Sequence, residues 1–284
     1  MRYEDYELGS LDNFINNYRK VDKKDFYNAY VTVNNVIFRW NKEKGHVETL
    51  TVKKPNQPFK DFYSLVGGFL LDNNETTDEA IERITKEKIG LDISEYYHKQ
   101  IKTYTDPRRD IRGRVISIAY ITILPEGTDV SGDVNWCPIG YSSIANRYEI
   151  FLKGTMYNVD RAKQYIKNIY DRLESYYNNV YPYRYEINEK NSLAFDHIVM
   201  ISDALSYIKG VSQDDYPLPL LMLKQPFTAL DARAILRQGN FSKASYYNST
   251  GNFIKHFDDY IEKVGKLDKK VAHVRSGQFL YKLK

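Results

Sequence analysis

Residues 64–91 read SLVGGFLLDNNETTDEAIERITKEKIGL, and the rest of the fold can be built outward from them. The stretch begins as a strand that runs into paired glycines. Residues 77–89 are predicted to form a helix, because Thr76 or Thr77 can serve as its N-cap and Gly90 can end it. A strand, a glycine pair, a loop and a helix therefore follow one another.

Strand patterns lie on both sides of this stretch. Residues 27–40 alternate in strand fashion and are predicted to form a hairpin with residues 46–52. Residues 101–104 and 115–124 predict two further strands, and the second is nearly continuous in apolar residues, which is typical of a central strand. Helices are expected in three other segments, namely 11–18, 160–177 and 195–208. The expected fold class is α+β.

The composition is that of a folded protein. The chain has 284 residues, of which 42% are hydrophobic and 27% charged, so disorder is excluded as its main state. Its longest apolar run, 115–124, is far shorter than the roughly 20 residues that cross a bilayer, and the acidic start has no signal-peptide core. We therefore expect a cytoplasmic protein with no membrane partner.

Cysteine and histidine usage gives no sign of a metal site. Cys137 is the single cysteine and cannot form an internal disulfide, which agrees with a reducing compartment. The five histidines show no metal-ligand spacing, so we expect neither a structural zinc site nor another cofactor.

The charge is divided unevenly along the chain. The net charge is only +4, but residues 216–284 hold 12 Lys and Arg against 5 Asp and Glu, an excess of seven. Residues 1–215 then hold 29 against 32. The Tyr-Pro-Leu-Pro stretch at 216–219 interrupts the helical pattern at the same place, so we place a domain boundary there. The predicted parts are an N-terminal segment (1–26), a first domain (27–212) and a second, basic domain (213–284).

The second domain has the pattern of a winged helix-turn-helix. Thr228 and Asp231 resemble a capping box that begins a short helix ending near Gln238. Asn248 or Ser249 then caps a second helix, which Gly265 is expected to end. Its apolar residues form one stripe: Phe253, Phe257, Tyr260, Ile261 and Val264. Two short strands at 271–275 and 279–283 are expected to form the wing.

The first domain carries a partial match to the Nudix box. The matching residues are Gly68, Glu75, Arg83, Glu87, Gly90 and Leu91, with six rather than five residues between the first two. The resemblance implies a Nudix-like α/β/α sandwich with a mixed sheet. In the family, carboxylates at helix positions i, i+3 and i+4 hold Mg²⁺ for the hydrolysis of a diphosphate.

Here those three helix positions are occupied by Ile84, Glu87 and Lys88. An isoleucine offers no oxygen and a lysine repels a divalent cation, so we predict no metal site and no catalytic residue. The alternative role for Glu75 and Glu87 is that of ordinary solvated carboxylates.

An arginine-rich loop follows at residues 106–114. Together with the strand after it, the loop resembles the Arg-Asp-x-Arg-Gly-Arg-Val-x-Ser stretch of Nudix domains in the ADP-ribose-related group. A guanidinium group can bind two phosphate oxygens at once, so the loop is predicted to bind an anion. The alternative is a solvated charged loop. The sequence at 193–197 also looks like the family's Phe/Tyr-Asp-His stretch, whose histidine is either a ligand contact or a structural residue. The ligand-binding residues that we predict are Arg109, Arg112, Arg114, Gly68, Glu75, Arg83, Glu87 and His197.

The second domain supplies the predicted DNA-binding residues, because winged helices place the start of the second helix in the major groove. These residues are Tyr247, Asn248, Ser249, Asn252, Lys255 and His256, with Lys269, Lys270, His273, Arg275 and Gln278 on the wing. Asn248 and Asn252 are suited to base edges, and the others to phosphates. The alternative is a winged helix used for protein contact.

The combination of both domains resembles the Nudix-related transcriptional regulators of the NrtR type over residues 27–284. This resemblance implies a homodimeric repressor on a palindromic DNA operator, released by a small phosphorylated effector such as ADP-ribose and controlling NAD-related metabolism. The alternative is a Mg²⁺-dependent ADP-ribose or nucleotide-diphosphate pyrophosphatase with an appended binding module. Residues 141–185 depart from the family pattern and hold ten of the 26 tyrosines. They are expected either in the effector pocket or at a domain or dimer interface.

Overall fold

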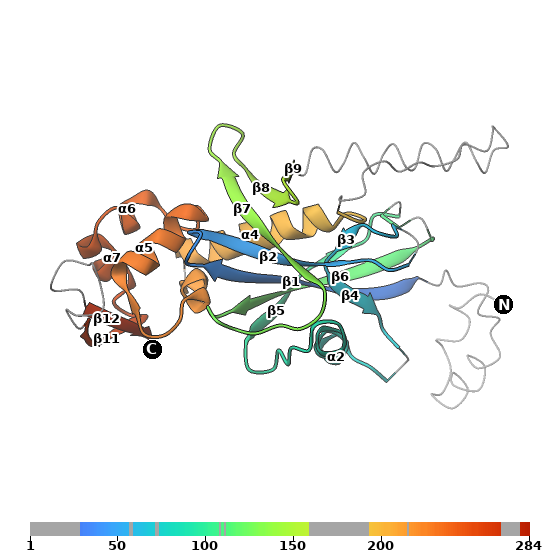
Figure 1. The fold of residues 1–284 in the computed structure, drawn as a ribbon, viewed down its shortest axis with the longest axis horizontal. Helices are drawn as coiled ribbons and strands as arrows, with labels where there is room; N and C mark the ends of the chain where they lie inside the picture. The colour runs from blue at the N-terminus through green and yellow to red at the C-terminus, as the bar shows by residue number, and fades with distance from the viewer. Residues whose placement is uncertain are drawn as a thin grey trace, which may run out of the picture.

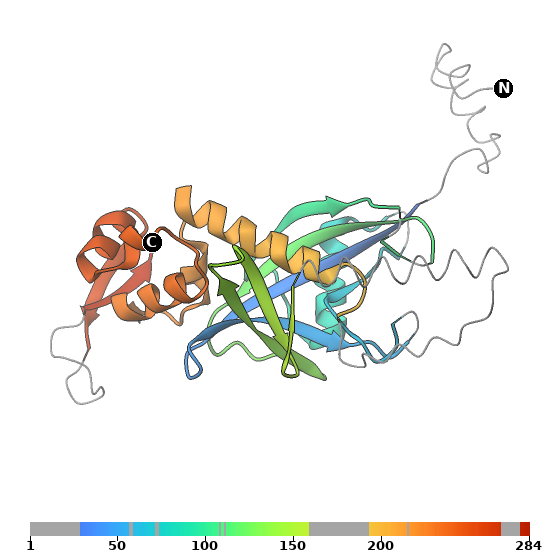
Figure 2. The same ribbon diagram turned by 90° about the horizontal axis from the view of Figure 1, so that it is seen from above.

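The computed structural model of the protein describes residues 29–56, 59–71, 74–107, 109–110, 112–158, 193–214, 216–267 and 279–284. The predicted helices at 11–18 and 160–177 and the predicted strand at 271–275 lie outside these ranges. The molecule is elongated, with a large sheet in one half and the C-terminal helices in the other (Figures 1 and 2). In the part of the chain that the structure describes, none of the helices has the length and apolar character needed to cross a membrane.

Nine strands of the described residues form one mixed sheet, which confirms the expected fold class. Its order is β5-β6-β1-β2-β7-β8-β9, with β3 paired to β2 and β4 paired to β1. The central strand β1 runs parallel to β6 and antiparallel to β2 and β4. The bounds are β1 Tyr30–Asn41, β2 His46–Lys53, β3 Tyr63–Ser64, β4 Val66–Phe69, β5 Tyr97–Tyr104, β6 Val115–Leu124, β7 Val134–Ser142, β8 Arg147–Leu152 and β9 Thr155–Tyr157.

Helices cover both faces of this sheet. Helix α2 (Thr77–Ile89) packs on one face and α4 (His197–Asp214) on the other (Figure 1). Because successive side chains of a strand point to opposite faces, β1 contributes Val33 to the apolar core under α2 and Val36 to the core under α4. In β6, Tyr120 and Ile121 divide in the same way. The apolar character of β6 is therefore explained, and its predicted central position is confirmed.

Helix α2 has the bounds predicted from its end signals. Thr76, rather than Thr77, is the N-cap, and it forms a capping box with Glu79. Gly90 ends the helix with φ of 66°, in the left-handed conformation that glycine adopts at low cost. The close approach of β4 to the central strand also requires glycine, since a Cβ on Gly67 would lie 2.6 Å from the Val33 carbonyl oxygen.

The C-terminal part of the chain, from residue 216 onward, is a small winged helix-turn-helix. After a 3₁₀ helix (η3, Leu218–Met222), its described strands form a sheet of order β10-β12-β11. The bounds are β10 Phe227–Thr228, α5 Ala229–Gln238, α6 Ala244–Tyr247, α7 Thr250–Phe257, β11 Ile261–Lys266 and β12 Phe279–Leu283. The predicted caps are confirmed at Thr228, which forms a capping box with Asp231, and at Ser249.

The prediction of one long helix from residue 249 to residue 264 was wrong. Helix α7 ends at Phe257, where Asp258 and Asp259 place negative charge at the unfavourable end of the helix dipole. Ile261 is buried by pairing opposite Leu283 in the wing, and Val264 is 45% exposed instead of completing a helical stripe. Among the described residues, the last strand, β12, pairs with β11 on one side and with β10 on the other.

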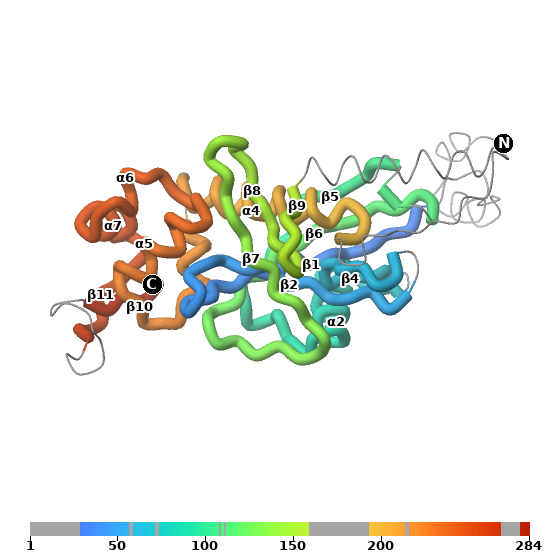
Figure 3. Tube along the Cα trace, turned by 45° about the horizontal axis from the view of Figure 1, so that its top comes forward, coloured from blue at the N-terminus to red at the C-terminus, as the bar shows by residue number. Residues whose placement is uncertain are grey.

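The two halves share one apolar core, which runs from Val36 in the large sheet to Tyr281 in the wing. The C-terminal end of α5 is also bound to the sheet by polar contacts. Gln238 Oε1 accepts from Val47 N at 2.9 Å, and its Nε2 donates to Ile139 O at 2.6 Å. Figure 3 shows the β1–β2 hairpin reaching the C-terminal half at this point.

Candidate functional site

A cavity of about 390 Å³ lies at the end of β2, beside the paired glycines of β4 and the beginning of α4. This volume falls within the range that small-molecule sites occupy. Four of the predicted ligand-binding residues line it: Gly68, Arg109, Arg112 and His197. The other four, which are Glu75, Arg83, Glu87 and Arg114, are not among its lining residues.

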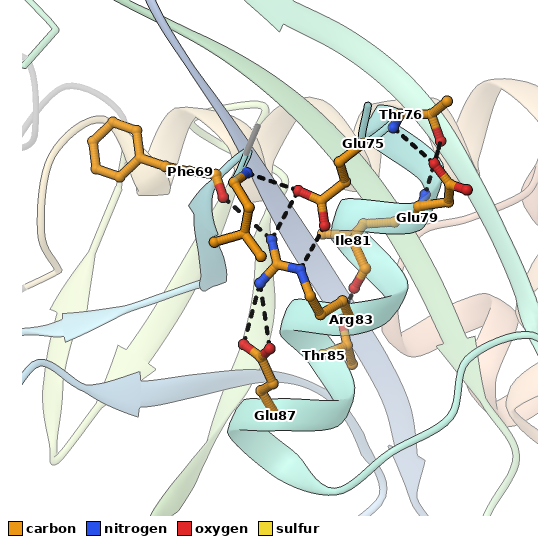
Figure 4. Close-up of polar contacts among 9 residues, drawn as sticks. Phe69, Glu75, Thr76, Glu79, Ile81, Arg83, Thr85 and Glu87 are labelled. Atoms are coloured by element: carbon orange, nitrogen blue, oxygen red, sulfur yellow. Dashed lines mark hydrogen bonds and ion pairs between the residues drawn. The ribbon is translucent and has the colours of Figure 1, made fainter. Parts of the chain in front are cut away.

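Two carboxylates of the box, Glu75 in the loop before α2 and Glu87 on α2, are held by one arginine (Figure 4). Arg83 donates to Glu75 from Nε at 2.5 Å and from Nη2 at 3.0 Å, and its Nη1 lies 3.2 Å from Glu87 Oε2. The Leu71 backbone N–H donates to Glu75 as well, at 2.9 Å. The hydrogen bonds from Arg83 hold the pKa of Glu75 below its usual range. Arg83 therefore supplies positive charge to both carboxylates.

The two other box positions, Ile84 and Lys88, differ in their surroundings. Ile84 is buried, and it packs so closely that a Cβ on Gly68 would lie 3.1 Å from its Cδ1. Lys88 lines the cavity and donates from Nζ to the Gly67 carbonyl oxygen. Among the described residues no group of three His, Cys, Asp or Glu side chains is arranged to hold a metal ion.

The arginines of the 106–114 loop differ in their surroundings. Arg109 is buried and forms two hydrogen bonds with Asp196, at 2.9 and 2.6 Å. Arg112 forms a similar pair with Asp110, but its side chain is 38% exposed and its guanidinium lies over the ring of Phe69. Arg109 therefore joins the loop to the start of α4, whereas Arg112 presents its edge to the cavity.

His197 is a buried, neutral donor at the cavity wall. Its Nδ1 accepts a hydrogen bond from Leu65 N at 3.1 Å. Burial and the positive charges of Arg109, Lys54 and Lys88 hold its pKa well below the ordinary value. In a neutral imidazole whose Nδ1 is an acceptor, the proton is on Nε2, which can donate to a ligand oxygen.

Three lysines of the cavity, Lys53, Lys54 and Lys88, were not predicted as ligand-binding residues. Burial and the charge of Arg112 lower the pKa of Lys54, while burial and the charge of Lys54 lower the pKa of Lys88. Lys54 directly follows β2 and belongs to no motif, and the sequence marked Lys88 only as a residue that disrupts metal binding. The signal that could have identified Lys88 is its place on the helix, one turn after the buried Ile84.

The predicted DNA-binding residues that the structure describes lie around α6 and α7. Asn248, Ser249, Asn252 and Lys255 are exposed, and Asn252 donates to Asn248 Oδ1 at 2.7 Å. Two others are engaged within the protein: Tyr247 is buried, and His256 stacks on Tyr246 with 3.4 Å between ring centroids. The five predicted wing residues, which are Lys269, Lys270, His273, Arg275 and Gln278, lie outside the described residues.

Two curated proteins share sequence with this chain. It is 35% identical over 135 residues to the ADP-ribose pyrophosphatase of Methanocaldococcus jannaschii, a match that covers 45% of this chain and 75% of the relative. It is 27% identical over 103 residues to the ADPR responsive transcriptional repressor NtrR of Acinetobacter baylyi, covering 36% of this chain and 40% of the relative. No protein-family model matches the chain.

Solved structures share the fold over nearly the whole chain. A MutT/nudix family protein from Enterococcus faecalis superimposes with a TM-score of 0.72 and 22% identity, covering 99% of this chain and 97% of that one. NrtR of Shewanella oneidensis superimposes with a TM-score of 0.59 and 19% identity, covering 89% and 94%. The same protein in complex with a 27mer DNA gives a TM-score of 0.55 at 19% identity, covering 89% and 93%. The similarity therefore extends through the C-terminal winged helix as well as the large sheet.

Proposed function

The chain belongs to the Nudix family, and from this premise we propose that it is a DNA-binding transcriptional regulator that senses a phosphorylated ligand. The observation that carries the proposal is the union, in one chain, of a cationic cavity in a Nudix-type sheet and a C-terminal winged helix. The ligand is a phosphorylated nucleotide or sugar such as ADP-ribose, since relatives act on or respond to that molecule. Such a regulator works on chromosomal DNA in the cytoplasm.

The last quarter of the chain, residues 216–284, fits DNA in charge and fold. Its excess of seven positive charges favours contact with phosphates, and the fold matches that of NrtR bound to DNA. Exposed Asn248 and Asn252 at the start of α7 have the amide groups that read base edges, and Lys255 is suited to a phosphate. We propose a homodimer on a palindromic operator, in which each winged helix contacts one half-site.

The proposed regulator does not hydrolyse its ligand, because the box residues do not fit Mg²⁺. Of the three helix positions, one holds a buried isoleucine, one a carboxylate paired with Arg83 and one an ammonium group. Divalent magnesium needs oxygen ligands in near-octahedral geometry, and this set offers one shared carboxylate.

Strand β2 supplies a physical connection between the two activities. Its C-terminal end, at Val52 and Lys53, lines the cavity, and its N-terminal end, at Val47, binds Gln238 of α5. We propose that a ligand in the cavity shifts this strand and with it the spacing of the two winged helices of a dimer. DNA affinity then falls, because the dimer no longer matches the spacing of its half-sites. The protein is in this way a repressor that its effector releases from DNA.

The test is a fluorescence anisotropy titration with labelled DNA from the promoter of the protein's own gene. We expect sequence-specific binding that weakens as salt rises, and release of the DNA on addition of ADP-ribose. Binding that is insensitive to salt and shows no preference for that sequence would contradict the proposal. Neighbouring genes of NAD biosynthesis or nicotinamide uptake would support a role in NAD-related metabolism.

The second candidate function is hydrolysis of ADP-ribose or another nucleotide diphosphate. The 35% identity to the M. jannaschii pyrophosphatase favours it. A Mg²⁺-dependent release of AMP from ADP-ribose that disappears in Glu87→Gln would establish this activity and overturn the proposed loss of the metal site.

A further inference from the structure

Two ammonium groups in the cavity, those of Lys54 and Lys88, form no ion pair with a carboxylate of the described residues. The other cations on its wall are paired, as Lys53 is with Asp61 at 3.3 Å, Arg109 with Asp196 and Arg112 with Asp110. For Lys54 and Lys88, the described residues place no carboxylate oxygen within ion-pair distance. Asp110 attracts Lys54 and Glu87 attracts Lys88 without forming an ion pair, so both ammonium groups can still donate to a ligand.

The positions of these two lysines frame one part of the cavity. Lys88 comes from the last turn of α2 and donates to the carbonyl of Gly67, so its ammonium lies beside the paired glycines of β4. Lys54 comes from the end of β2, with Nζ 5.5 Å from the centre of the Phe195 ring. His197 lines the same cavity, and its pKa is lowered by burial, by Arg109 and then by the charges of both lysines. Two cations and one neutral N–H donor thus converge on one space.

This arrangement is costly without an anion. Each ammonium is partly removed from water, and Lys88 also lies close enough to Lys54 for the like charge to lower its pKa. A diphosphate brings two negative charges and several acceptor oxygens, and it relieves both costs together. Lysine binds phosphate as a point charge without the planar geometry that an arginine fork requires.

We propose that Lys88 and Lys54 hold the diphosphate of the ligand directly and take the place that a divalent metal ion has in an active Nudix site. The inference rests on the proposed function, in which the cavity binds a phosphorylated ligand, and it adds the residues that capture the diphosphate. The ligand is a diphosphate ester, and its binding is independent of metal ions. His197 donates from Nε2 to a phosphate oxygen in the same site.

Isothermal titration calorimetry with the full chain tests this assignment. In EDTA, we expect both ADP-ribose and inorganic pyrophosphate to bind to the wild-type protein. Adding millimolar MgCl₂ is expected to change the Kd for ADP-ribose less than twofold. Lys88→Gln and Lys54→Gln each weaken the binding of both probes about ten- to hundredfold, as expected for the loss of one charge-assisted hydrogen bond.

The matched control is Lys86→Gln on the same helix. Lys86 is 69% exposed and lies 3.6 Å from Asp92, away from the cavity, so its loss is expected to leave both affinities unchanged. Lys88→Gln is expected to fold normally, since it removes a charge that has no ion-pair partner among the described residues. Its thermal unfolding curve checks this.

Three results would overturn the inference: binding of ADP-ribose only when Mg²⁺ is present, affinities that Lys88→Gln leaves unchanged, or no binding of either probe. Failure of the proposed function has a different signature. If ADP-ribose binds in EDTA and depends on both lysines while promoter DNA is never bound or released, the regulatory proposal fails and the capture by Lys88 and Lys54 stands.

Discussion

Arg109 offers a test that separates a structural role from a ligand-binding role. The sequence placed it among the ligand contacts, and in the structure it lines the cavity while its side chain is 4% exposed and forms two hydrogen bonds with Asp196, at 2.6 and 2.9 Å. Arg109→Ala leaves the Asp196 carboxylate largely buried without its counter-charge. Breaking one side of such a pair costs about 3–5 kcal/mol, whereas an exposed ion pair contributes about 1 kcal/mol or less.

Urea denaturation followed by tryptophan fluorescence measures this cost. With a slope of about 3 kcal/mol per molar urea, the loss corresponds to a fall in the midpoint of about 1–2 M. Lys102→Ala is the control, since Lys102 pairs with Asp203 at 2.7 Å but is 53% exposed, and it is expected to shift the midpoint by less than about 0.4 M.

A second variant keeps the test decisive if Arg109→Ala does not fold. Replacing both partners, as in Arg109→Met with Asp196→Leu, removes the unpaired charge and is expected to recover most of the lost stability. The reasoning is refuted if Arg109→Ala unfolds within about 1 kcal/mol of the wild type while losing affinity for ADP-ribose. That result would return Arg109 to the set of ligand contacts.

Three further predictions address coupling, pH and DNA. Gln238→Ala leaves two backbone groups of the sheet without their partner, so we expect a loss of about 1–3 kcal/mol in urea titrations and a weaker effect of ADP-ribose on DNA affinity. The pKa of His197 is lowered in the folded state, so the unfolded chain binds the extra proton and stability falls as pH drops below about 6.5. His197→Asn, whose Oδ1 can still accept from Leu65 N, is expected to flatten that pH dependence, and a slope equal to that of the wild type would assign it to other groups. Lys255→Gln is expected to reduce the slope of log Kd against log salt by about one unit in anisotropy titrations, with Lys86→Gln unchanged.

Elements with local end signals could be predicted from the sequence. Helix α2 begins after Thr76 and ends at Gly90, and both signals act within a few residues of the helix itself. Strand β6 was predicted with its observed bounds because helices on both faces require apolar residues at nearly every position.

Strands that depend on partners remote in sequence were not predicted from the sequence. Strands β7, β8 and β9 were absent from the prediction, since β7 contains Pro138 and Gly140 and has weak strand propensity of its own. It forms because β2 pairs with it from far away in the sequence, with Thr49 opposite Cys137 among others. Ile261 was assigned to a helix for the same reason, because its strand partner, Leu283, is remote in sequence.

The candidate site shows the same division between local pattern and distant partner. Four arginines within seven residues predicted a phosphate site, but the charge of Arg109 is taken by Asp196, 87 residues further along the chain. Lys54 belongs to no motif and Lys88 stands at a box position that the family gives to a carboxylate, and only the fold brings them to one cavity. A charge run in a sequence gives the number of cations, whereas ion pairing in the fold decides which of them remain available to a ligand.

The box helix is present, but one of its three metal-ligand positions carries an ammonium group instead of a carboxylate. In an active site of the family, carboxylates on α2 gather around a cation; here Arg83 binds Glu75 and Glu87, and Lys88 places an ammonium beside Gly67. A single-site reversion such as Lys88→Glu therefore adds a carboxylate but leaves Arg83 bound to the other two. We expect this variant to lose affinity for ADP-ribose without gaining Mg²⁺-dependent hydrolysis, because the remaining arginine already neutralises the charge that a metal ion would need. If the single variant Lys88→Glu gains hydrolysis, then Glu75 and Glu87 can exchange Arg83 for a metal ion, and this expectation is wrong.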